Sequence, residues 1–278
     1  MKPEPGDRRI VVTRADVAAG AQGVGIGPGD TAMFHSSLSS MGTVEGGPNT
    51  VIDGFLDAVG LTGTVAVPTL WWHVADPPLT LDQWDIATSP AYIGTVPEAF
   101  RQRPDSVRSD NPTHAVSAIG ARADELTRDH GAGGLRPCVF RDSAFAAASP
   151  WQRLYDWNAA YCFIGVDFTV NTMGHFIECR VIERALAAAP EARRAGLEAR
   201  LRRWEKDGVY PRYRFQAMGE RLAELGHVRF GRIGSATLRC IGARDMVDHA
   251  LAVLDAEPGA WFDDDFLAWL HDTQRERT

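Results

Sequence analysis

The alternation of apolar strands with an amphipathic helix between residues 31 and 70 constrains the fold of this chain most strongly. The segment "TAMFHSSLSSMG" begins as a short apolar strand and ends in small polar residues. In "GGPNTVIDGFLDAVG", apolar residues recur at helical spacing, with Pro48 and Asn49 at the expected start and Gly60 at the expected end. A second apolar strand follows in "GTVAVPTLWW", and Pro68 either ends it or confines it to a sheet edge. This order predicts a layered α/β fold.

Further strands and helices are expected along the middle of the chain. A helix is predicted in "TVPEAFRQRP", and "VSAIGARADELTRDHG" starts as a strand and continues as a helix with Gly131 at its end. The segment "AAYCFIGV" is typical of a buried strand. After it, Thr172 is the expected N-cap of a helix that runs to about Ala189, where Pro190 ends it.

The last third of the chain continues the same alternation. Residues 191–204 are heavily charged, which indicates a solvated helical face. We expect a strand in "RIGSATLRCIG" and a helix in "ARDMVDHALAVLDAEP". The whole chain, residues 1–278, is therefore expected to form one α/β domain.

One long segment does not follow this alternation. Residues 73–97 are rich in Pro, Trp and Asp and show no sustained period. This composition predicts an ordered loop that covers the sheet, and such loops often carry function.

Composition excludes several classes of protein. The formal net charge of -7 argues against non-specific binding to nucleic acid, which needs a basic face. No apolar run is long enough to cross a bilayer, and "MKPEPGDRRI" lacks the apolar core of a signal peptide, so we expect a cytoplasmic protein with no membrane partner. The four cysteines are scattered singly, without the spacing of a CxxC motif or a zinc cluster, and are expected to be reduced and mostly buried.

Charge is distributed unevenly along the chain. No Lys or Arg lies between Arg14 and Arg101. Nine acidic residues fall in that interval: Asp16, Asp30, Glu45, Asp53, Asp57, Asp76, Asp82, Asp85 and Glu98. A cavity built from this half of the chain would attract a cationic ligand. The alternative is that these carboxylates only solvate the surface.

Two polar segments are candidate ligand-binding loops. In "HSSLSSMG", serines follow a strand and precede a helix, where backbone N–H groups and hydroxyls can hold a phosphate or a pantetheine amide. The alternative is a serine-rich turn that caps the helix. In "RSDNPTH", Arg108 can reach phosphate oxygens, and His114 either points into the same cleft or is satisfied within its loop. The glycine-rich "GVGIGPG" precedes a strand instead of following one, so we interpret it as a turn.

The stretch "NTMGHFIE" brings a histidine and a glutamate into reach of each other. On a helix that starts near Thr172, residues three apart lie on the same side, so Glu178 can accept a hydrogen bond from one nitrogen of His175. The other nitrogen is then available as an oriented general base. Unpaired N–H groups of the first helical turn can also stabilise a developing oxyanion.

Three other interpretations of this stretch stay open. His175 and Glu178 can form a metal site with His35 and His114, although "HFIEC" lacks the second histidine of an HxxEH pattern. Ser36 or Ser37 can act as a nucleophile paired with His175, but no sequence motif marks such a pair. The pair can also be purely structural.

Taken together, these motifs give the sequence its resemblance to the aminoglycoside 3-N-acetyltransferase family, also called the antibiotic N-acetyltransferases. Three blocks carry the resemblance: "MFHSSLSSMGTVEGGPNTVIDGFLDAVGLTGTVAVPT", "SPAYIGTVPEAFRQRPDSVRSDNPTHAVSAIG" and "SPWQRLYDWNAAYCFIGVDFTVNTMGHFIE". The blocks span most of the chain, and their order and spacing are specific in combination.

The resemblance implies an α/β enzyme with a central mixed β-sheet flanked by helices, unlike the smaller GNAT-type acetyltransferases. It implies direct transfer of acetyl from acetyl-CoA to an amine in a ternary complex, without a metal. His175 is implied as the base, Glu178 as its orienting partner, and Thr172 as a neighbour of the thioester carbonyl. The residues implied to line the coenzyme cleft are His35, Ser36, Ser37, Leu38, Ser39, Thr69, Arg108, Ser109 and His114.

One departure from the family pattern affects the acceptor. The region from Trp71 to Trp84 is compact, and "WDIATSPAY" stands where many aminoglycoside-modifying members carry a longer loop. We expect this loop to contact the acceptor, so the particular antibiotic stays open. The acidic first half of the chain favours a cationic amine: an aminoglycoside, an amino sugar or another natural-product amine.

Two alternative functions and the oligomeric state stay open at the level of sequence. The first alternative is a metal-dependent hydrolase that uses His35, His114, His175 and Glu178. The second is a non-catalytic coenzyme A-binding protein. A homodimer is compatible with the sequence, which does not fix the oligomeric state.

Overall fold

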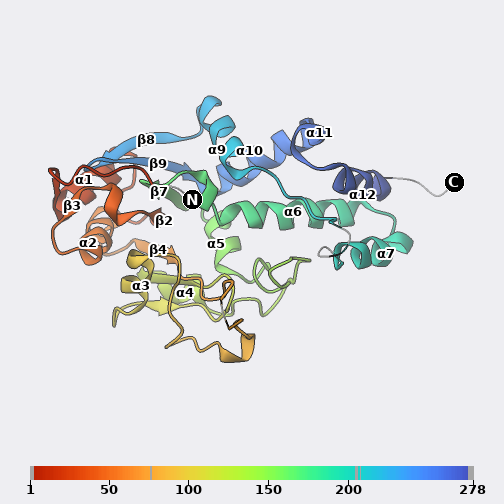
Figure 1. Cartoon of the computed structure of the whole chain (residues 1–278), viewed down its shortest axis with the longest axis horizontal. Coiled ribbons are helices and arrows are strands. Elements are labelled where there is room, and N and C mark those ends of the chain that lie inside the picture. The colour runs from red at the N-terminus through yellow and green to blue at the C-terminus, as the bar shows by residue number, and fades with distance from the viewer. Residues whose placement is uncertain (1–2, 76, 204–205, 207, 275–278) are drawn as a thin grey trace.

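A seven-stranded mixed sheet forms the centre of the protein in the computed structural model, which describes residues 3–75, 77–203, 206 and 208–274. Its strand order is β5-β6-β4-β2-β7-β9-β8 (Figure 1). The strands are β2 (Thr31–Ser36), β4 (Thr64–Pro68), β5 (Val107–Arg108), β6 (Val116–Gly120), β7 (Ala160–Ile164), β8 (Arg229–Ile233) and β9 (Ala236–Gly242). Strand β2 pairs in parallel with β4 and β7, and the outer pairs are antiparallel. The predicted α/β fold with a mixed sheet is confirmed.

Helices cover both faces of this sheet (Figure 1). One face carries α1 (Arg14–Gly23), α2 (Pro48–Val59) and α3 (Thr95–Arg101). The other face carries α4 (Ala123–Thr127), α5 (Pro150–Asp156), α6 (Met173–Ala188), α9 (Phe215–Glu224) and α10 (Ala243–Ala256). Beyond them lie α7 (Glu191–Leu201), α11 (Pro258–Trp261) and α12 (Asp264–Gln274). A small parallel sheet consists of β1 (Val11–Val12) and β3 (Thr43–Val44). The described chain also has three short 3-10 helices: η1 (Leu38–Ser40), η2 (Leu81–Gln83) and η3 (Phe168–Val170).

The core consists of two apolar layers, one on each face of the sheet. Because side chains alternate along a strand, Ala32 and Phe34 of β2 face the α1–α3 layer while Met33 faces the opposite layer. Phe34 stacks on Phe55 of α2, with ring centroids 4.5 Å apart. The sheet is therefore covered on both faces, which explains why its central strands are continuous apolar runs.

Most predicted elements are confirmed, with corrections at two turns. Helix α2 has Pro48 at its first turn and Gly60 as its C-cap, with a φ of 63° that favours glycine. Pro68 is the last residue of β4, a strand paired on both sides, so it ends the strand and does not mark an edge. The single strand predicted in "RIGSATLRCIG" is wrong, because Gly234 at φ 57° opens a turn that separates β8 from β9. The helix predicted to end at Gly131 ends at Thr127.

The ends of α6 also differ in detail from expectation. Its bounds match the prediction, and Thr172 occupies the N-cap position. However, the backbone of Thr172 is already helical, with φ -65° and ψ -29°, and its side chain caps no backbone N–H. The N-cap role predicted for this hydroxyl is therefore wrong. Two predicted features involve residues outside the described part of the chain, namely Asp76 among the acidic residues and Trp204 at the end of the charged stretch.

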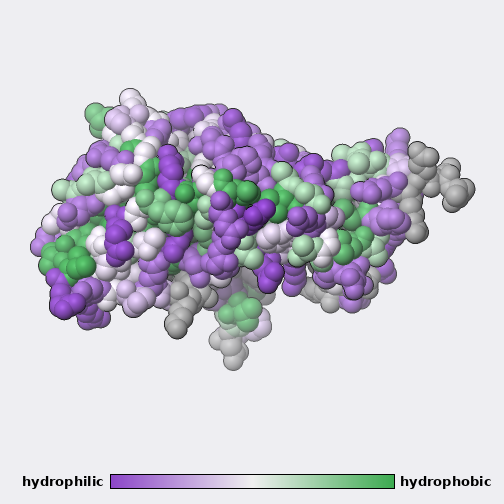
Figure 2. All heavy atoms as spheres, turned by 90° about the horizontal axis from the view of Figure 1, so that it is seen from above, coloured by the Kyte–Doolittle hydropathy of each residue, from purple (hydrophilic) through white to green (hydrophobic). Residues whose placement is uncertain are grey.

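On the face of the molecule shown in Figure 2, polar and apolar residues are mixed, and the hydrophobic residues form only small groups. None of the helices in the described part of the chain combines the length and apolar character needed to cross a bilayer. All four cysteines are free and buried.

Candidate active site

A cavity lies at the edge where two central parallel strands end. Strands β2 and β7 run in register, with Ser36 opposite Ile164 at their carboxyl ends. The chain leaves β7 through η3 and enters α6. Oη of Tyr161 contacts both His35 of β2 and the amide of Met173, so the first turn of α6 lies close to the end of β2. Ligands of open α/β sheets collect outside the carboxyl ends of strands. The cavity has a volume of about 880 Å³.

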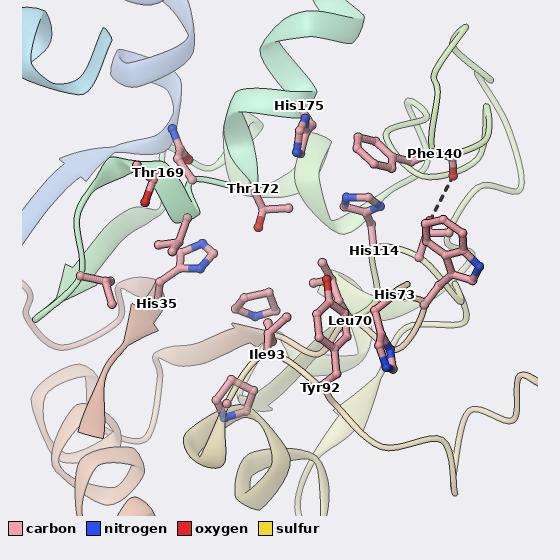
Figure 3. A pocket seen from close by; sticks show the side chains of 18 of the residues that line it. His35, Leu70, His73, Tyr92, Ile93, His114, Phe140, Thr169, Thr172 and His175 are labelled. Atoms are coloured by element: carbon pink, nitrogen blue, oxygen red, sulfur yellow. Dashed lines mark hydrogen bonds between the residues drawn. The ribbon is translucent and has the colours of Figure 1, made fainter. Parts of the chain in front are cut away.

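The side chains around this cavity are mostly aromatic and apolar, with four histidines among them (Figure 3). The sheet and α6 contribute His35, Ser36, Pro68, Thr172 and His175; the loops and η3 contribute Leu70, Trp72, His73, Val74, Tyr92, Ile93, Thr113, His114, Phe140, Thr169, Val170 and Asn171. Phe215 of α9 closes one side. The lining thus combines residues far apart in the sequence.

His175 and Glu178 form the pair expected from their spacing on α6. Nδ1 of His175 lies 2.7 Å from Oε2 of Glu178, whose side chain is only 3% exposed. The imidazole is 29% exposed and lines the cavity. Since Nδ1 is engaged by the carboxylate, Nε2 is the nitrogen available to a ligand.

Aromatic rings fix the orientation of the His175 imidazole. Phe140 and Phe215 meet it edge-on, with centroid distances of 4.5 Å and 4.9 Å. Gly174 allows Phe215 to approach this closely, because a Cβ at that position would lie 2.7 Å from the ring atom Cζ. The ring of His175 is therefore held by a carboxylate at one nitrogen and by packing on its sides.

His35 ends the sheet side of the cavity as a neutral imidazole. Its Nε2 lies 2.8 Å from Oη of Tyr161, and its ring stacks on Phe163 at 5.5 Å. Burial lowers the pKa of His35 to about 3, because the charged form would lose its hydration. This histidine is uncharged at neutral pH.

His114 is a second buried histidine, and it lies near His175. It is 3% exposed, and its ring centroid lies 6.0 Å from that of His175. Burial lowers its pKa well below the ordinary value, with a smaller contribution from His175. Its Nδ1 has no hydrogen-bond partner among the described residues.

The first turn of α6 does not offer the free N–H groups expected from the sequence. The amide of Met173 donates to Oη of Tyr161 at 3.3 Å, and the amide of Gly174 donates to the carbonyl of Asn171 at 3.0 Å. The amide of His175 donates to the carbonyl of Thr172 at 3.1 Å. The expectation of unpaired helix-terminal donors is therefore wrong, and Thr172, which lines the cavity, is the donor side chain nearest in sequence to His175.

A second hollow of about 460 Å³ adjoins the first at the serine loop. Ser36, Ser37, Leu38 and Ser39 line it, and it shares Ser36, Ile93 and Gly94 with the larger cavity. Arg8 contributes a cation to its rim. An extended ligand lying in this hollow would reach the larger cavity at its His35 end.

Three residues expected in the cleft serve the surrounding framework instead. The guanidinium of Arg108 donates to the carbonyls of Ser89 and Thr69, both at 2.5 Å, and lies over the ring of Trp84. Burial lowers the pKa of Arg108 to about 10, so it stays charged at neutral pH. Ser109 accepts a hydrogen bond from the amide of Val116, at 2.9 Å. None of Thr69, Arg108 and Ser109 lines either hollow.

The sequence did not identify the individual aromatic residues that line one side of the cavity. His73 and Tyr92 stack with centroids 4.5 Å apart, and Trp72 stands beside them in the lining. Phe140 and Phe215 come from loops and helices with no polar motif. The available signal was the aromatic composition of residues 71–92, which does not tell which rings face inward.

The expectation of an acidic cavity is wrong for the described residues, since no Asp or Glu is among those that line it. Asp53 lies 2.6 Å from Arg103, and Asp57 lies 2.5 Å from Arg14. Other carboxylates hold loop backbones: Asp85 accepts from the amides of Ala87 and Thr88, and Glu98 accepts from that of Ala91 and pairs with Arg101. Much of the acidity of the first half is thus used in ion pairs and turns.

In the described part of the chain, no group of three or more His, Cys, Asp or Glu side chains is arranged to hold a metal ion. Of the four residues considered for a metal site, His35 is hydrogen bonded to Tyr161, and His175 is paired with Glu178.

Comparisons with known proteins agree with the fold and identify the family. The family model described as "Aminoglycoside 3-N-acetyltransferase" matches residues 33–255. The aminoglycoside N(3)-acetyltransferase VII of Streptomyces paromomycinus is 32% identical, with 89% of this chain and 93% of the relative covered. The crystal structure of aminoglycoside acetyltransferase AAC(3)-Xa is 25% identical, with a TM-score of 0.67 over 88% of this chain and 93% of that one. The structure described as "AAC-IIIb binary with CoASH" is 20% identical, with a TM-score of 0.67 over 89% and 97%.

Proposed function

This chain belongs to the aminoglycoside 3-N-acetyltransferase family, and from that premise we propose that it transfers acetyl from acetyl-CoA to the amine of a small molecule. The acceptor is an aminoglycoside, an amino sugar or another natural-product amine. His175 is the general base and Glu178 orients it. The observation that carries this proposal is the 2.7 Å contact between Nδ1 of His175 and Glu178, which leaves Nε2 of His175 for a substrate at the cavity.

The reaction requires little covalent help from the protein, because a thioester is already activated. The amine nitrogen attacks the acetyl carbon, a C–N bond forms, and the C–S bond breaks to release coenzyme A as a thiol. Nε2 of His175 accepts the proton that the nitrogen loses, and Glu178 stabilises the resulting imidazolium. General base assistance of this kind contributes about 10²–10⁴ in rate.

One feature supports a coenzyme on the His35 side of the cavity. The serine loop from Ser36 to Ser39 offers hydroxyl groups along a hollow that opens into the cavity beside Gly94. A pantetheine arm has amides and a carbonyl that match such groups, and Thr172 can donate to the thioester carbonyl as negative charge develops on it. One solved relative is described as a complex with CoASH.

A thiol-release assay tests this proposal. Purified protein is mixed with acetyl-CoA and a panel of amines, and free thiol is measured with and without a chelator. We expect release that depends on the amine and is insensitive to the chelator. Chelator-sensitive turnover without coenzyme would instead select the metal-dependent hydrolase. Thermal stabilisation by coenzyme A without any thiol release would select the non-catalytic binding protein; at 100 times Kd a ligand adds about 2.7 kcal/mol.

A further inference from the structure

The cavity has two chemically different ends, with the reactive pair between them. Figure 3 shows His35 and Thr169 at one end, Tyr92, His73 and Phe140 at the other, and His175 in the middle. The first end continues into the hollow of the serine loop. Since the coenzyme of the proposed reaction occupies that side, the acceptor occupies the end formed by Tyr92, His73 and Phe140, here called the acceptor end.

The acceptor end is built from rings and aliphatic side chains. Its members are Leu70, Trp72, His73, Tyr92 and Phe140. Trp72 is 38% exposed and Tyr92 is 47% exposed, so both present ring surface that a ligand can cover. His73 is stacked on Tyr92, and its Nδ1 lies 2.8 Å from the carbonyl of Trp71, which fixes the stack to the loop. The rings are thus held in place before a ligand arrives.

No carboxylate among the described residues faces this end. The shallow neighbouring hollow beyond Thr169 and Phe215 contains one, Glu220, which accepts a hydrogen bond from Gln216 at 2.8 Å and shares the hollow with the cation Arg214. A second neighbouring hollow, which shares Tyr92 and Gly94 with the cavity, contains Glu98, but this carboxylate already accepts from the amide of Ala91 and pairs with Arg101. Among the described residues, the walls of the cavity therefore provide no carboxylate to pair with several ammonium groups.

Charge and shape together define the acceptor. Ammonium groups that leave water without a carboxylate partner lose hydration that nothing replaces, and the loss grows with each group. A single ammonium beside the faces of Trp72 and Tyr92 gains a cation–π attraction, and an apolar body gains the burial of its surface. We propose that the preferred acceptor is an amine with one positive charge and an aromatic or apolar body, not a polycationic aminoglycoside. This inference rests on the proposed acetyl transfer and narrows its acceptor.

A matched set of acceptors tests the choice directly. We would measure kcat/KM for acetyl-CoA-dependent acetylation of tryptamine, glucosamine and neamine, which carry one amine with an aromatic ring, one amine with a polar ring, and four amines. Tryptamine should exceed neamine by at least about tenfold. A higher kcat/KM for neamine overturns the inference while leaving acetyl transfer intact. The absence of thiol release with every amine overturns the acetyl transfer itself, and the inference with it.

Substitutions at the acceptor end provide an independent readout. Tyr92→Glu should raise kcat/KM for neamine at least about fivefold over the matched Tyr92→Gln, and added salt should reduce the difference. Trp72→Ala should raise KM for tryptamine at least about fivefold with a smaller change in kcat. Leu225→Ala, at an exposed position after α9, is the control that leaves both acceptors unaffected. Equal neamine turnover by the Tyr92→Glu and Tyr92→Gln variants would contradict the charge argument.

Discussion

The two ends of the cavity differ in how they are built. The His35 end is formed by adjacent parallel strands and the first turn of α6, and His35 is buried there, with 7% of its surface exposed. The acceptor end is formed by loop residues such as Trp72 and Tyr92, whose rings are partly exposed. Under the proposed function, the regular framework holds the reacting groups, whereas the loops select the amine. Changes at the framework end should therefore alter kcat, and changes at the acceptor end should alter KM or acceptor choice.

The largest expected effect is at the framework end. His175→Ala removes the proton acceptor and should lower kcat by at least about 10², with the affinity for coenzyme A retained. Steady-state kinetics and calorimetric titration with coenzyme A measure the two quantities separately. His271→Ala, on the exposed face of α12, is the matched control. If kcat stayed within twofold of the unmodified protein, His175 would not be the base.

The second effect concerns the stability of the framework in acid. The pKa of His35 is about 3 and that of His130 about 4, both below the ordinary value because of burial. A depressed histidine pKa means that the unfolded chain binds more protons below about pH 6.5, so stability is highest above that pH and falls as pH drops toward 4. The expected loss is about 1.4 kcal/mol per pH unit for each such histidine.

Urea unfolding between pH 7 and pH 5 measures this loss. The variant His35→Gln has no titrating ring at this position. The slope of its unfolding free energy against pH should therefore be smaller by the contribution of one histidine. The same substitution at the exposed His271 should leave the slope unchanged. Parallel slopes for the unmodified protein and for His35→Gln would contradict a neutral, desolvated His35.

Glu178→Gln should have a third, smaller effect. The amide can still accept a hydrogen bond from Nδ1 of His175, so the ring keeps its orientation, but the negative charge that stabilises the imidazolium is lost. We expect kcat to fall about tenfold at unchanged KM for the amine. Glu224→Gln, at an exposed position on α9, is the control. A fall in coenzyme affinity without a fall in kcat would assign Glu178 a structural role.

The smallest effect is expected for Arg108, which anchors the loop "WDIATSPAY". Arg108 ties the carbonyls of Ser89 and Thr69 together and stacks on Trp84. Arg108→Gln should loosen this loop and raise KM for the amine about threefold, with kcat nearly unchanged. Kinetics with a fixed, saturating concentration of acetyl-CoA measure it, and Arg221→Gln on α9 serves as control. A loss of coenzyme affinity alone would return Arg108 to the coenzyme side predicted from the sequence.

The same contrast explains what could be predicted from the sequence. Strand β2, helix α2 and the pair His175–Glu178 follow from local spacing, because periodicity and i,i+3 geometry are properties of neighbouring residues. The direction in which Arg108 points does not, because its partners Ser89 and Thr69 are 19 and 39 residues away in the chain. The prediction of an acidic cavity from residues 16–98 was wrong for the same reason. Asp53 pairs with Arg103, 50 residues away in the chain, and this contact forms only when α2 packs against the end of α3. Long-range pairing decides which polar groups stay free for a ligand.

A structure of the protein with coenzyme A and an amine bound would show directly where the two substrates lie relative to His175. We predict the coenzyme sulfur on the His35 side and the amine nitrogen within about 2.6–3.2 Å of Nε2 of His175, with the body of the amine against Tyr92. A sulfur atom at the Tyr92 end, or an amine nitrogen out of reach of His175, would contradict the assignment of the two ends and of the base.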